Sequence, residues 1–515
     1  MSDCPSTQLD VIGEMQEKWD IVDALMGGTD AMRKAGEQFL PKWPKEEDDA
    51  YKDRLKLSTL LPAFSETVEN MTGRVFADPI GLGEEMPESI RTQTDDIDLQ
   101  GNNLAVWATD WFKKSLAYGM CHALAEYPTK PEGVRTRQQE RAAGLRPYAV
   151  LVAPQQVLGW KTDYSAGAPR LTQFRYMESV EVDDGEFGVS TIQQIRVLEI
   201  GRWRVFRKSA EKSKKGAWEL HKEGKTSLNK IPLVTFYTKR TGFMTASPPL
   251  LELAHLNITH WQSQSDQRNI LHIARVPILA AINAEDGQDA QGNAVPWEMT
   301  IGASTATRLN GERADLKFVE HTGKSIEAGR TDLQDLIDEM RMAGAKLLQK
   351  EKQAVKTAAQ ANEEAAQELS PLEAMASSFE DAIDQLLQFF ADYQGEKSGG
   401  YVQVNGNFDV DTAPEITLPL LRDMADKGFL SAETLFKEVQ RRRGLADDLE
   451  WSVELERLKA QNNRPEAGLL QQLIMAMGSQ VASQETLWEY LCTGKIPERN
   501  WGEESARIES AAPTE

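Results

Sequence analysis

The sequence has few cysteines and no long apolar run. It has three cysteines in 515 residues, and Cys4, Cys121 and Cys492 lie far apart, which favours a reducing compartment over a disulfide framework. No apolar run approaches the roughly 18–20 residues that cross a bilayer, and the longest, residues 276–282, we interpret as a core segment. The first ten residues lack the basic flank and apolar stretch of a secretory signal. We therefore expect a protein without disulfides and without membrane contact.

Residues arranged for catalysis or metal binding are also scarce. His255 and His260 are five residues apart, which places them on different faces of a helix, whereas zinc-binding helices use a spacing of four. The sequence has no Gly-x-Ser-x-Gly elbow and no Gly-x-Gly-x-x-Gly after an expected strand. We predict no catalytic residues, no metal site and no cofactor, and we expect that the protein is not an enzyme.

One short motif points the other way. Gly323-Lys324-Ser325 matches the end of the phosphate-binding loop Gly-x-x-x-x-Gly-Lys-Ser/Thr. The first glycine of that loop must lie five residues before Gly323, and that residue is Phe318. Because the glycine lets the backbone approach phosphate closely, Phe318 breaks the pattern. We interpret the motif as a turn, with Ser325 at or near the N-cap of the following helix, and keep a nucleotide-dependent enzyme as an alternative.

The chain is strongly acidic. It carries 80 acidic and 58 basic residues, a formal net charge of −22. A protein that grips DNA tightly usually presents a basic face, because neutralising phosphates drives affinity. The average charge of this chain repels nucleic acid, which fits a surface past which DNA moves without being held.

The hydrophobic pattern predicts an α+β fold that is mainly helical. Helical spacing dominates residues 14–80, with a stripe through 60–71 that is interrupted or bent at Pro62, and returns in a helix over 103–119. Residues 146–240 change to short β-branched and aromatic runs separated by turn residues, which is typical of an antiparallel sheet. Within it, EIGRWRV (199–205) predicts a hairpin, and the basic loop 134–146 we expect to be mobile and solvated.

Two long helices follow, with a small insertion between them. The first is bounded by Ser247-Pro248-Pro249 and Pro277, and its middle, 262–269, is polar on every side, which suggests passage through a wet interface. The insertion, 281–325, contains the expected strands 301–309 and 316–321 joined by Asn310-Gly311. The second helix carries a narrow apolar seam suited either to packing along another helix or to an ordinary amphipathic face. The seam residues are Leu333, Leu336, Met340, Ala343 and Leu347.

The next two segments contrast sharply. Residues 350–367 are rich in Ala, Gln and charge, so they have high helix propensity and nothing to bury. Ser370, Pro371 and Glu373 then predict a capping box at the start of a helix. We expect one face of that helix to be core, and residues 401–410 to form a strand. The face consists of Leu372, Met375, Phe379, Ile383, Leu386 and Phe390.

The C-terminal region contains an internal echo. Ser-x-Glu-Thr-Leu-aromatic occurs at Ser431 and again at Ser483, 52 residues later. Each copy follows an expected apolar helix and is followed by a glycine. We predict a duplicated helix-turn-helix pair in a small helical bundle, with the serine as N-cap and the aromatic residue as packing anchor.

The order of these parts resembles the portal proteins of tailed bacteriophages. The phrases that carry the resemblance are FLPKWPKEEDDAYKDRL (39–55), MTGRVFADP (71–79), SPPLLELAHLNITHW (247–261), the stretch 318–348 and NGNFDV (405–410). Each phrase alone is moderately specific, and their order over about 400 residues makes the match. The segment KTAAQANEE (356–364) departs from the pattern expected of such proteins.

The resemblance implies an architecture of wing, stem, clip and crown. It assigns 1–247 to the wing with its sheet at about 146–240, 248–276 to a first stem helix, 277–328 to the clip, 329–349 to a second stem helix, 350–370 to a tunnel loop, 371–413 to a helix and strand of the wing, and 414–515 to a helical crown and C-terminal tail.

The resemblance also implies a function and partners. The chain would form a ring of about 12 copies at one capsid vertex, a channel for packaging and ejecting double-stranded DNA in a virion that is assembled in the host cytoplasm. A terminase motor, head-completion or adaptor proteins, and major capsid and scaffolding proteins would contact it. Lys350, Lys352 and Lys356 are then candidates to face DNA, and the seam from Leu333 to Leu347 is a candidate for stem packing. A structural or scaffolding adaptor without a channel remains the alternative.

Overall fold

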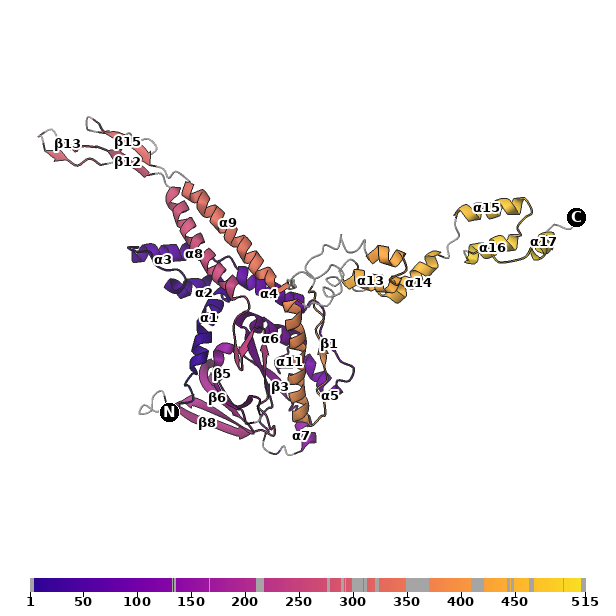
Figure 1. Ribbon diagram of the computed structural model, residues 1–515, viewed down its shortest axis with the longest axis horizontal. Helices are drawn as coiled ribbons and strands as arrows, with labels where there is room; N and C mark the ends of the chain where they lie inside the picture. The colour runs from indigo at the N-terminus through magenta and orange to yellow at the C-terminus, as the bar shows by residue number, and fades with distance from the viewer. Residues whose placement is uncertain are drawn as a thin grey trace. The chain divides into compact units, whose positions relative to one another are not determined.

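The computed structural model divides into two compact units, Met1–Phe408 and Asp409–Glu515. It describes all residues except 1–3, 132, 134–135, 166, 210–216, 276–277, 289–290, 292, 299–308, 310–312, 320–323, 349–369, 409–420, 442–444, 446–448, 463–466, 494 and 511–515. Helices and antiparallel sheets occur in the same chain, which makes the fold α+β as expected (Figure 1).

The N-terminal part of the first unit is mainly helical, as its periodicity predicts. Asn103 caps α6 by accepting a hydrogen bond from the Val106 amide at 2.9 Å, and Gly119 ends it with φ of 92°. The apolar stripe at 60–71 is interrupted at Pro62 and not bent there, because α4 begins only after Pro62, so the first of the two expected alternatives is confirmed. The α-helices up to residue 142 are α1 (Asp10–Met26), α2 (Gly28–Ala35), α3 (Asp48–Leu57), α4 (Ala63–Val75), α5 (Glu88–Arg91), α6 (Leu104–Tyr118) and α7 (Arg137–Ala142).

The expected single sheet is two sheets. One has the order β3-β2-β9 and draws β2 from before residue 146; the other is a meander in the order β4-β5-β6-β7-β8. The hairpin at 199–205 is confirmed by the pairing of Glu199 with Arg202. The basic segment 134–146 is not wholly a loop, because it contains the short helix α7. The strands are β2 (Met120–Glu126), β3 (Tyr148–Val152), β4 (Val157–Asp163), β5 (Arg170–Asp184), β6 (Gly188–Glu199), β7 (Arg202–Lys208), β8 (Trp218–Lys225) and β9 (Leu233–Tyr237).

Two apolar cores hold this unit together. The larger joins α6, β9 and α11 (Pro371–Gln394) through tilted and edge-to-face rings, with centroids of Phe236 and Phe379 at 4.7 Å and of Trp111 and Phe379 at 5.0 Å. The smaller packs α1 against the meander, where Trp19 lies in one cluster with Phe174 and donates to the Tyr118 carbonyl at 3.0 Å. Helix α11, which lies near the C-terminal end of the first unit, is thus packed against α6 and β9 from earlier in the chain.

The sequence predictions for α11 are confirmed. The Glu373 amide donates to Ser370 Oγ at 3.2 Å and the Ser370 amide donates to Glu373 at 3.4 Å, which is the capping box. Of the predicted core face, Met375 is partly buried and the other five side chains are fully buried. The strand expected over 401–410 is shorter among the described residues: β16 (Val402–Gln403) pairs with β1 (Gly81–Leu82).

The second unit is helical in the part that the structure describes. Residues 421–426 are helical, and the further helices are α13 (Ala432–Arg441), α14 (Trp451–Asn462), α15 (Ala467–Gly478), α16 (Gln484–Thr493) and α17 (Trp501–Ser510). A small core of Leu473, Ala482 and Tyr490 holds α15 and α16 together.

Candidate functional site

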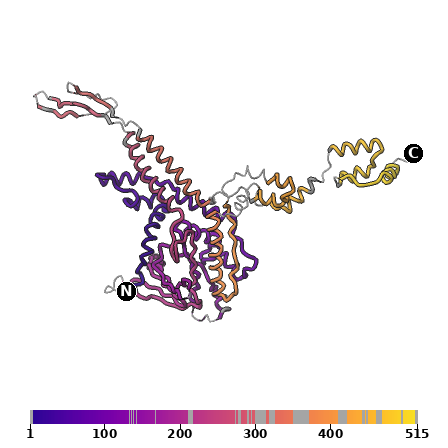
Figure 2. Tube along the Cα trace, viewed as in Figure 1, coloured from indigo at the N-terminus to yellow at the C-terminus, as the bar shows by residue number. Residues whose placement is uncertain are grey.

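The two long helices form an antiparallel hairpin that continues into a strand pair. Helix α8 (Leu251–Ala274) and helix α9 (Lys324–Ala345) run side by side, and β12 (Ile278–Ile282) pairs with β15 (Asp315–Val319) beyond them (Figure 2). Ile278 pairs with Val319 and Ile282 with Asp315, and every residue between them is paired in the same antiparallel order. Between the helices, Gly329 of α9 lies against Gln267 of α8, and Gly344 of α9 lies near Leu253 of α8. The strand pair thus has the same antiparallel course as the two helices.

The hairpin is a long rod by its own dimensions. The 24 residues of α8 span about 36 Å at 1.5 Å per residue. The prediction of a first long helix within 248–276 is confirmed, and so is the second, although it begins at Lys324. A short 3₁₀ turn, Lys346–Leu348, ends the return.

The polar middle of α8 is occupied by contacts to the N-terminal helices. Gln262 donates to the Phe39 carbonyl at 2.9 Å, Arg268 donates to the Leu57 carbonyl at 3.2 Å, and Ser265 Oγ lies 2.8 Å from Ser58 Oγ. The groups that they meet lie at the ends of short helices, where carbonyls lack partners within the helix. The wet interface inferred from the sequence is therefore not needed for these three side chains.

Asn257 anchors the base of the same helix. Its side chain is fully buried, donates to the Leu61 carbonyl and accepts from the Phe64 amide, both at 3.0 Å. These backbone groups lie on either side of Pro62, where α4 begins, and an amide in the first helical turn has no partner within the helix. One side chain thus satisfies both groups and ties α8 to the start of α4.

Within residues 39–55, several side chains and a carbonyl surround the guanidinium of Arg54. We call this group of contacts the Arg54 clamp. Arg54 makes a paired contact with Glu46, Nε to Oε1 at 2.7 Å and Nη2 to Oε2 at 2.8 Å, and also donates to the Pro41 carbonyl at 2.9 Å. The Trp43 ring covers the guanidinium at 4.1 Å. The pair is almost fully buried, at 3% and 5% exposed side-chain area. Because Asp266 of α8 lies 3.9 Å from Arg54, the clamp also faces the hairpin.

The predicted seam of α9 lies mostly inward. Leu336, Met340 and Leu347 are buried, while Leu333 and Ala343 are partly buried. Met340 and Leu347 belong to the larger core of the unit, and Ala343 packs against it. Within one chain the seam packs against its own unit. Its role in contacts between copies stays a prediction.

Helix α9 also carries exposed acidic side chains. Asp332, Asp335, Asp338 and Glu339 are exposed there. Arg341 contacts Asp338 at 3.0 Å. Across the hairpin, burial lowers the pKa of His260, while Asp332 opposes the shift. Helix α9 thus carries exposed negative charge.

The insertion corrects two interpretations of the sequence. Residues 278–282 of the apolar run are strand β12 of a two-stranded ribbon, with Ile282 exposed, so they do not form a core segment. The expected strand at 316–321 is confirmed in part as β15. The other expected strand, 301–309, and Asn310-Gly311 lie almost wholly outside the described residues. At the tip, β13 (Gly287–Gln288) pairs with β14 (Ala294–Val295).

The lysine and serine of the Gly-Lys-Ser motif begin helix α9, and Gly323 lies outside the described residues. Strand β15 ends at Val319 and α9 begins at Lys324, so Ser325 lies in the first helical turn, near the predicted cap. Phe318, which occupies the place of the required glycine, is part of β15. The three lysine candidates, Lys350, Lys352 and Lys356, lie outside the described residues.

A buried charged network that the sequence did not signal joins the two sheets. Glu126 on β2 contacts Arg196 on β6 at 2.7 Å and accepts from Tyr148 on β3 at 3.1 Å. Burial raises the pKa of Glu126, and Arg196 opposes the shift. Both carboxylate oxygens have partners, so the network ties one sheet to the other.

The described residues form neither a metal centre nor a membrane span. Among them, no group of His, Cys, Asp and Glu side chains is arranged to hold a metal ion. In the same part of the chain, no helix combines the length and apolar character that crossing a bilayer requires.

One protein family model matches the part of the chain that contains the hairpin. A family model described as "Domain of unknown function (DUF4055)" matches residues 249–394. That range begins just before α8 and ends at the last residue of α11, so it takes in the hairpin, the insertion and α11. No curated protein matches the chain.

Solved structures of gene transfer agent particles are similar over most of the chain. The neck of an empty particle, computed with C6 symmetry, is 14% identical with a TM-score of 0.39, covering 72% of this chain and 87% of that one. The virion of the native particle is 15% identical with a TM-score of 0.37, covering 74% and 90%. The neck of the native particle, with C12 symmetry, is 14% identical with a TM-score of 0.38, covering 72% and 87%.

The descriptions of these structures name the neck and the virion of a particle. Their TM-scores lie below 0.5, so they carry no argument about the architecture of this chain.

Proposed function

We propose that the chain is the subunit of a ring-shaped portal at one vertex of a phage-like capsid. Its channel passes double-stranded DNA during packaging and ejection, and its role is structural. In this assignment α8 and α9 are the stem, the β12–β15 arm is the clip, the two sheets with α11 belong to the wing, and the second unit is the crown. Residues 350–370 are the tunnel loop.

The observation that carries the proposal is the hairpin of two long helices with a strand pair beyond it. Asn257 fixes the base of this rod of two helices, the Arg54 clamp faces it further along at Asp266, and an antiparallel strand arm lies beyond it. Such a rod has too few apolar positions for a core of its own, and the exposed carboxylates of α9 suit solvent or a channel. Copies packed side by side around an axis would give the stem of a portal.

Charge supports a conduit for DNA. Twelve copies of a chain with net charge −22 carry about −264. A lumen that is mostly acidic prevents phosphates from being captured, so DNA slides. The exposed carboxylates of α9 supply part of that charge. Lys350, Lys352 and Lys356 on the tunnel loop would guide DNA at the constriction.

The partners follow from the assignment. The clip would bind the terminase motor and later the head-completion or adaptor proteins, whereas the wing and crown would meet major capsid and scaffolding proteins. A structural adaptor without a channel is the alternative. A nucleotide-dependent enzyme requires Phe318 to replace a glycine, and an ATPase assay tests it.

Imaging of the purified protein is the decisive experiment. We expect negative-stain images to show a ring with a central hole and mass measurement to give about 690 kDa for twelve chains of 57.5 kDa. An oligomer without a hole would favour the adaptor. A monomer at every concentration, alone and with capsid proteins, would overturn the proposal.

A further inference from the structure

The second unit contains a repeat that holds at the level of single hydrogen bonds. In the first copy the Phe429 amide donates to the Met424 carbonyl and the Gly428 amide to the Ala425 carbonyl. In the second copy the corresponding bonds lie 52 positions later, from the amide of residue 481 to the carbonyl of 476 and from 480 to 477. The helix–turn–helix pair predicted from the sequence echo is thus confirmed.

The helix that follows each turn is capped in the same way. The Thr434 amide donates to Ser431 Oγ at 3.1 Å, and the Thr486 amide donates to Ser483 Oγ at 3.2 Å. In both copies the serine and threonine hydroxyls also meet, at 2.8 Å and 3.1 Å. The serines are N-caps, as predicted.

The two copies differ in what covers the aromatic residue. In the first copy Phe436 packs on Trp451, the first residue of α14, with ring centroids 5.4 Å apart. The equivalent residue of the second copy is Trp488, and it is 68% exposed. Trp501, the first residue of α17, is 63% exposed. The prediction that the aromatic residue is a packing anchor holds for Phe436 and is wrong for Trp488 within one chain.

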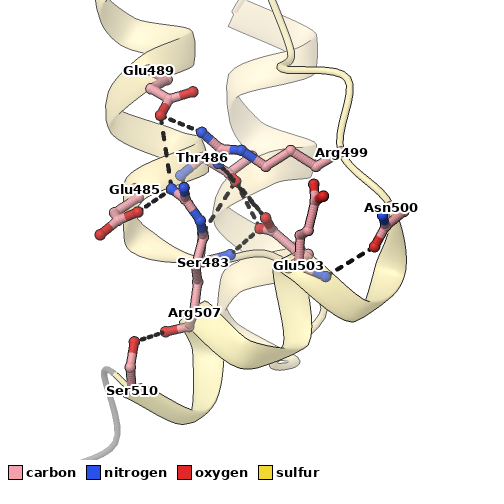
Figure 3. Close-up of polar contacts among 10 residues, drawn as sticks. Ser483, Glu485, Thr486, Glu489, Arg499, Asn500, Glu503, Arg507 and Ser510 are labelled. Carbon is pink, nitrogen blue, oxygen red and sulfur yellow. Dashed lines mark hydrogen bonds and ion pairs between the residues drawn. The ribbon is translucent and has the colours of Figure 1, made fainter.

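Helix α17 is held at the start of α16 (Figure 3). Glu504 accepts from the Ser483 amide at 2.6 Å and from the Thr486 hydroxyl at 2.7 Å, and Arg507 contacts Glu485. These bonds attach α17 to the capped first turn of α16 and leave Trp488 uncovered.

The uncovered side of α16 forms an apolar groove. Met477, Leu487, Trp488 and Leu491 line it, together with Gln484, Glu485 and Glu489, and its volume is about 530 Å³. The second unit holds about a fifth of the chain, but eleven of the 24 large apolar side chains that are exposed among the described residues lie in it. Exposure of this kind marks an interaction surface.

We propose that this groove, on α15 and α16, receives Trp501 of a second copy of the chain. The first repeat shows the pairing that the second lacks: an aromatic residue covered by the tryptophan that begins the next helix. Burying an aromatic side chain of this size removes about 150–250 Å² from water. Glu485 and Glu489 contact Arg507 and Arg499 of the same chain, so their charges are neutralised and the groove selects an apolar partner.

Groove and tryptophan are different surfaces, so in the proposed ring the contact runs head-to-tail from each copy to the next. A head-to-tail contact generates a closed ring when its rotation closes. The inference rests on the proposed ring and adds a specific contact to it, in the crown.

Disulfide trapping tests the contact directly in the full-length chain. Cys4→Ser and Cys492→Ser remove the exposed thiols, while the buried Cys121 stays. Leu491→Cys is placed in one tagged copy and Gly502→Cys, at the exposed position next to the retained Trp501, in a second, differently tagged copy, and the two are co-expressed. We expect an oxidised dimer containing both tags, and none when either variant is expressed alone. No mixed dimer, or dimers of a single variant, would overturn the inference.

Assembly measurements separate this inference from the proposed function. We expect Trp488→Ala and Trp501→Ala each to raise the concentration for half-assembly about tenfold, because a tryptophan that anchors an interface carries much of its binding energy. Phe187→Ala, which removes an exposed aromatic residue of the first unit, should leave that concentration unchanged.

The outcomes of that comparison are distinct. If the wild type forms rings and both tryptophan variants form them equally well, the groove assignment fails and the ring stands. If the wild type forms no ring, the proposed function fails first, and a mixed disulfide dimer would then still support the contact.

Discussion

Gln267 and Gly329 interlock where the two long helices meet. A Cβ atom at position 329 would overlap Gln267 Oε1, while Gln267 Nε2 donates to the Ile326 carbonyl at 2.8 Å. The side chain of Gln267 is buried, so it has no solvent to turn to if it is displaced. The missing side chain at 329 is therefore what allows the helices to approach and the glutamine to reach the first turn of α9.

Gly329→Ala should lower the stability of the hairpin. Displacing Gln267 from its partner costs about 1–3 kcal/mol, and alanine in place of glycine in a helix returns about 1 kcal/mol. In a Gln267→Ala background only the second effect remains, so the same substitution should stabilise. Hydrogen exchange of the amides in 324–345 measures both.

Gly13→Ala is the matched control for this pair of variants. Gly13 lies inside α1 and a Cβ there meets no atom within 4 Å. It should stabilise α1 by about 1 kcal/mol in both backgrounds. A Gly329→Ala effect of the same sign with and without Gln267 would contradict the interlock.

Glu46→Gln should destabilise the first unit at neutral pH. It removes the charge from a buried ion pair and leaves Arg54 with Asp266 as its nearest acidic neighbour. Breaking a buried pair in this way costs about 3 kcal/mol, which thermal unfolding measures. Asp49→Asn is the control, because the Lys52–Asp49 pair is exposed and such pairs contribute about 0–1 kcal/mol. Equal losses in the two variants would show that the clamp adds no more than a surface pair.

The same pair predicts an acid sensitivity. The hydrogen bonds from Arg54 lower the pKa of Glu46. A carboxylate with a lowered folded-state pKa adds stability above its unfolded value, about 4.3, and that stability is lost as pH falls from there through the folded pKa. Thermal unfolding from about pH 7 to pH 3 should show this loss in the wild type, and a smaller one in Glu46→Gln. Identical pH profiles would exclude Glu46 as the cause.

The sequence predicts elements best where the signal is local. The capping box at Ser370, the caps at Ser431 and Ser483, and the end of α6 at Gly119 depend on neighbours in the chain, and all are confirmed. The division of 146–240 into two sheets was missed because β2 precedes that range and pairs with β9, more than a hundred residues later. Periodicity carries no information on such distant partners.

In the candidate site, too, the features with a local sequence signal could be predicted, and those that depend on distant residues could not. The rods could be predicted from their apolar patterns and prolines, but the purpose of the polar middle of α8 could not. Gln262, Ser265 and Arg268 meet backbone and hydroxyl groups more than 200 residues earlier in the chain. The buried contact of Glu126 with Arg196 is likewise long-range, and no spacing announces it.

The tunnel-loop assignment predicts a packaging defect without an assembly defect. Lys350→Glu with Lys356→Glu reverses two charges that the proposal places near DNA, so rings should form normally while the DNA packaged per capsid falls. Lys56→Glu with Lys230→Glu makes the same charge change at exposed positions of the first unit. Normal packaging by the first pair, or an equal defect in the second, would remove the assignment.

The clip assignment predicts a loss of motor binding. The arm is closed at its tip by the pairing of Gly287 with Val295, and β12 and β15 hold the register below it. Shortening 286–296 should therefore remove the tip, leave the strand pair and the ring intact, and weaken binding of the terminase motor about tenfold, which corresponds to about 1.4 kcal/mol. Surface-bound rings titrated with the motor give the affinity, and electron microscopy of the same sample checks that rings persist. Unchanged motor affinity with intact rings would show that the tip is not the docking site, because its removal would then have taken away no contact.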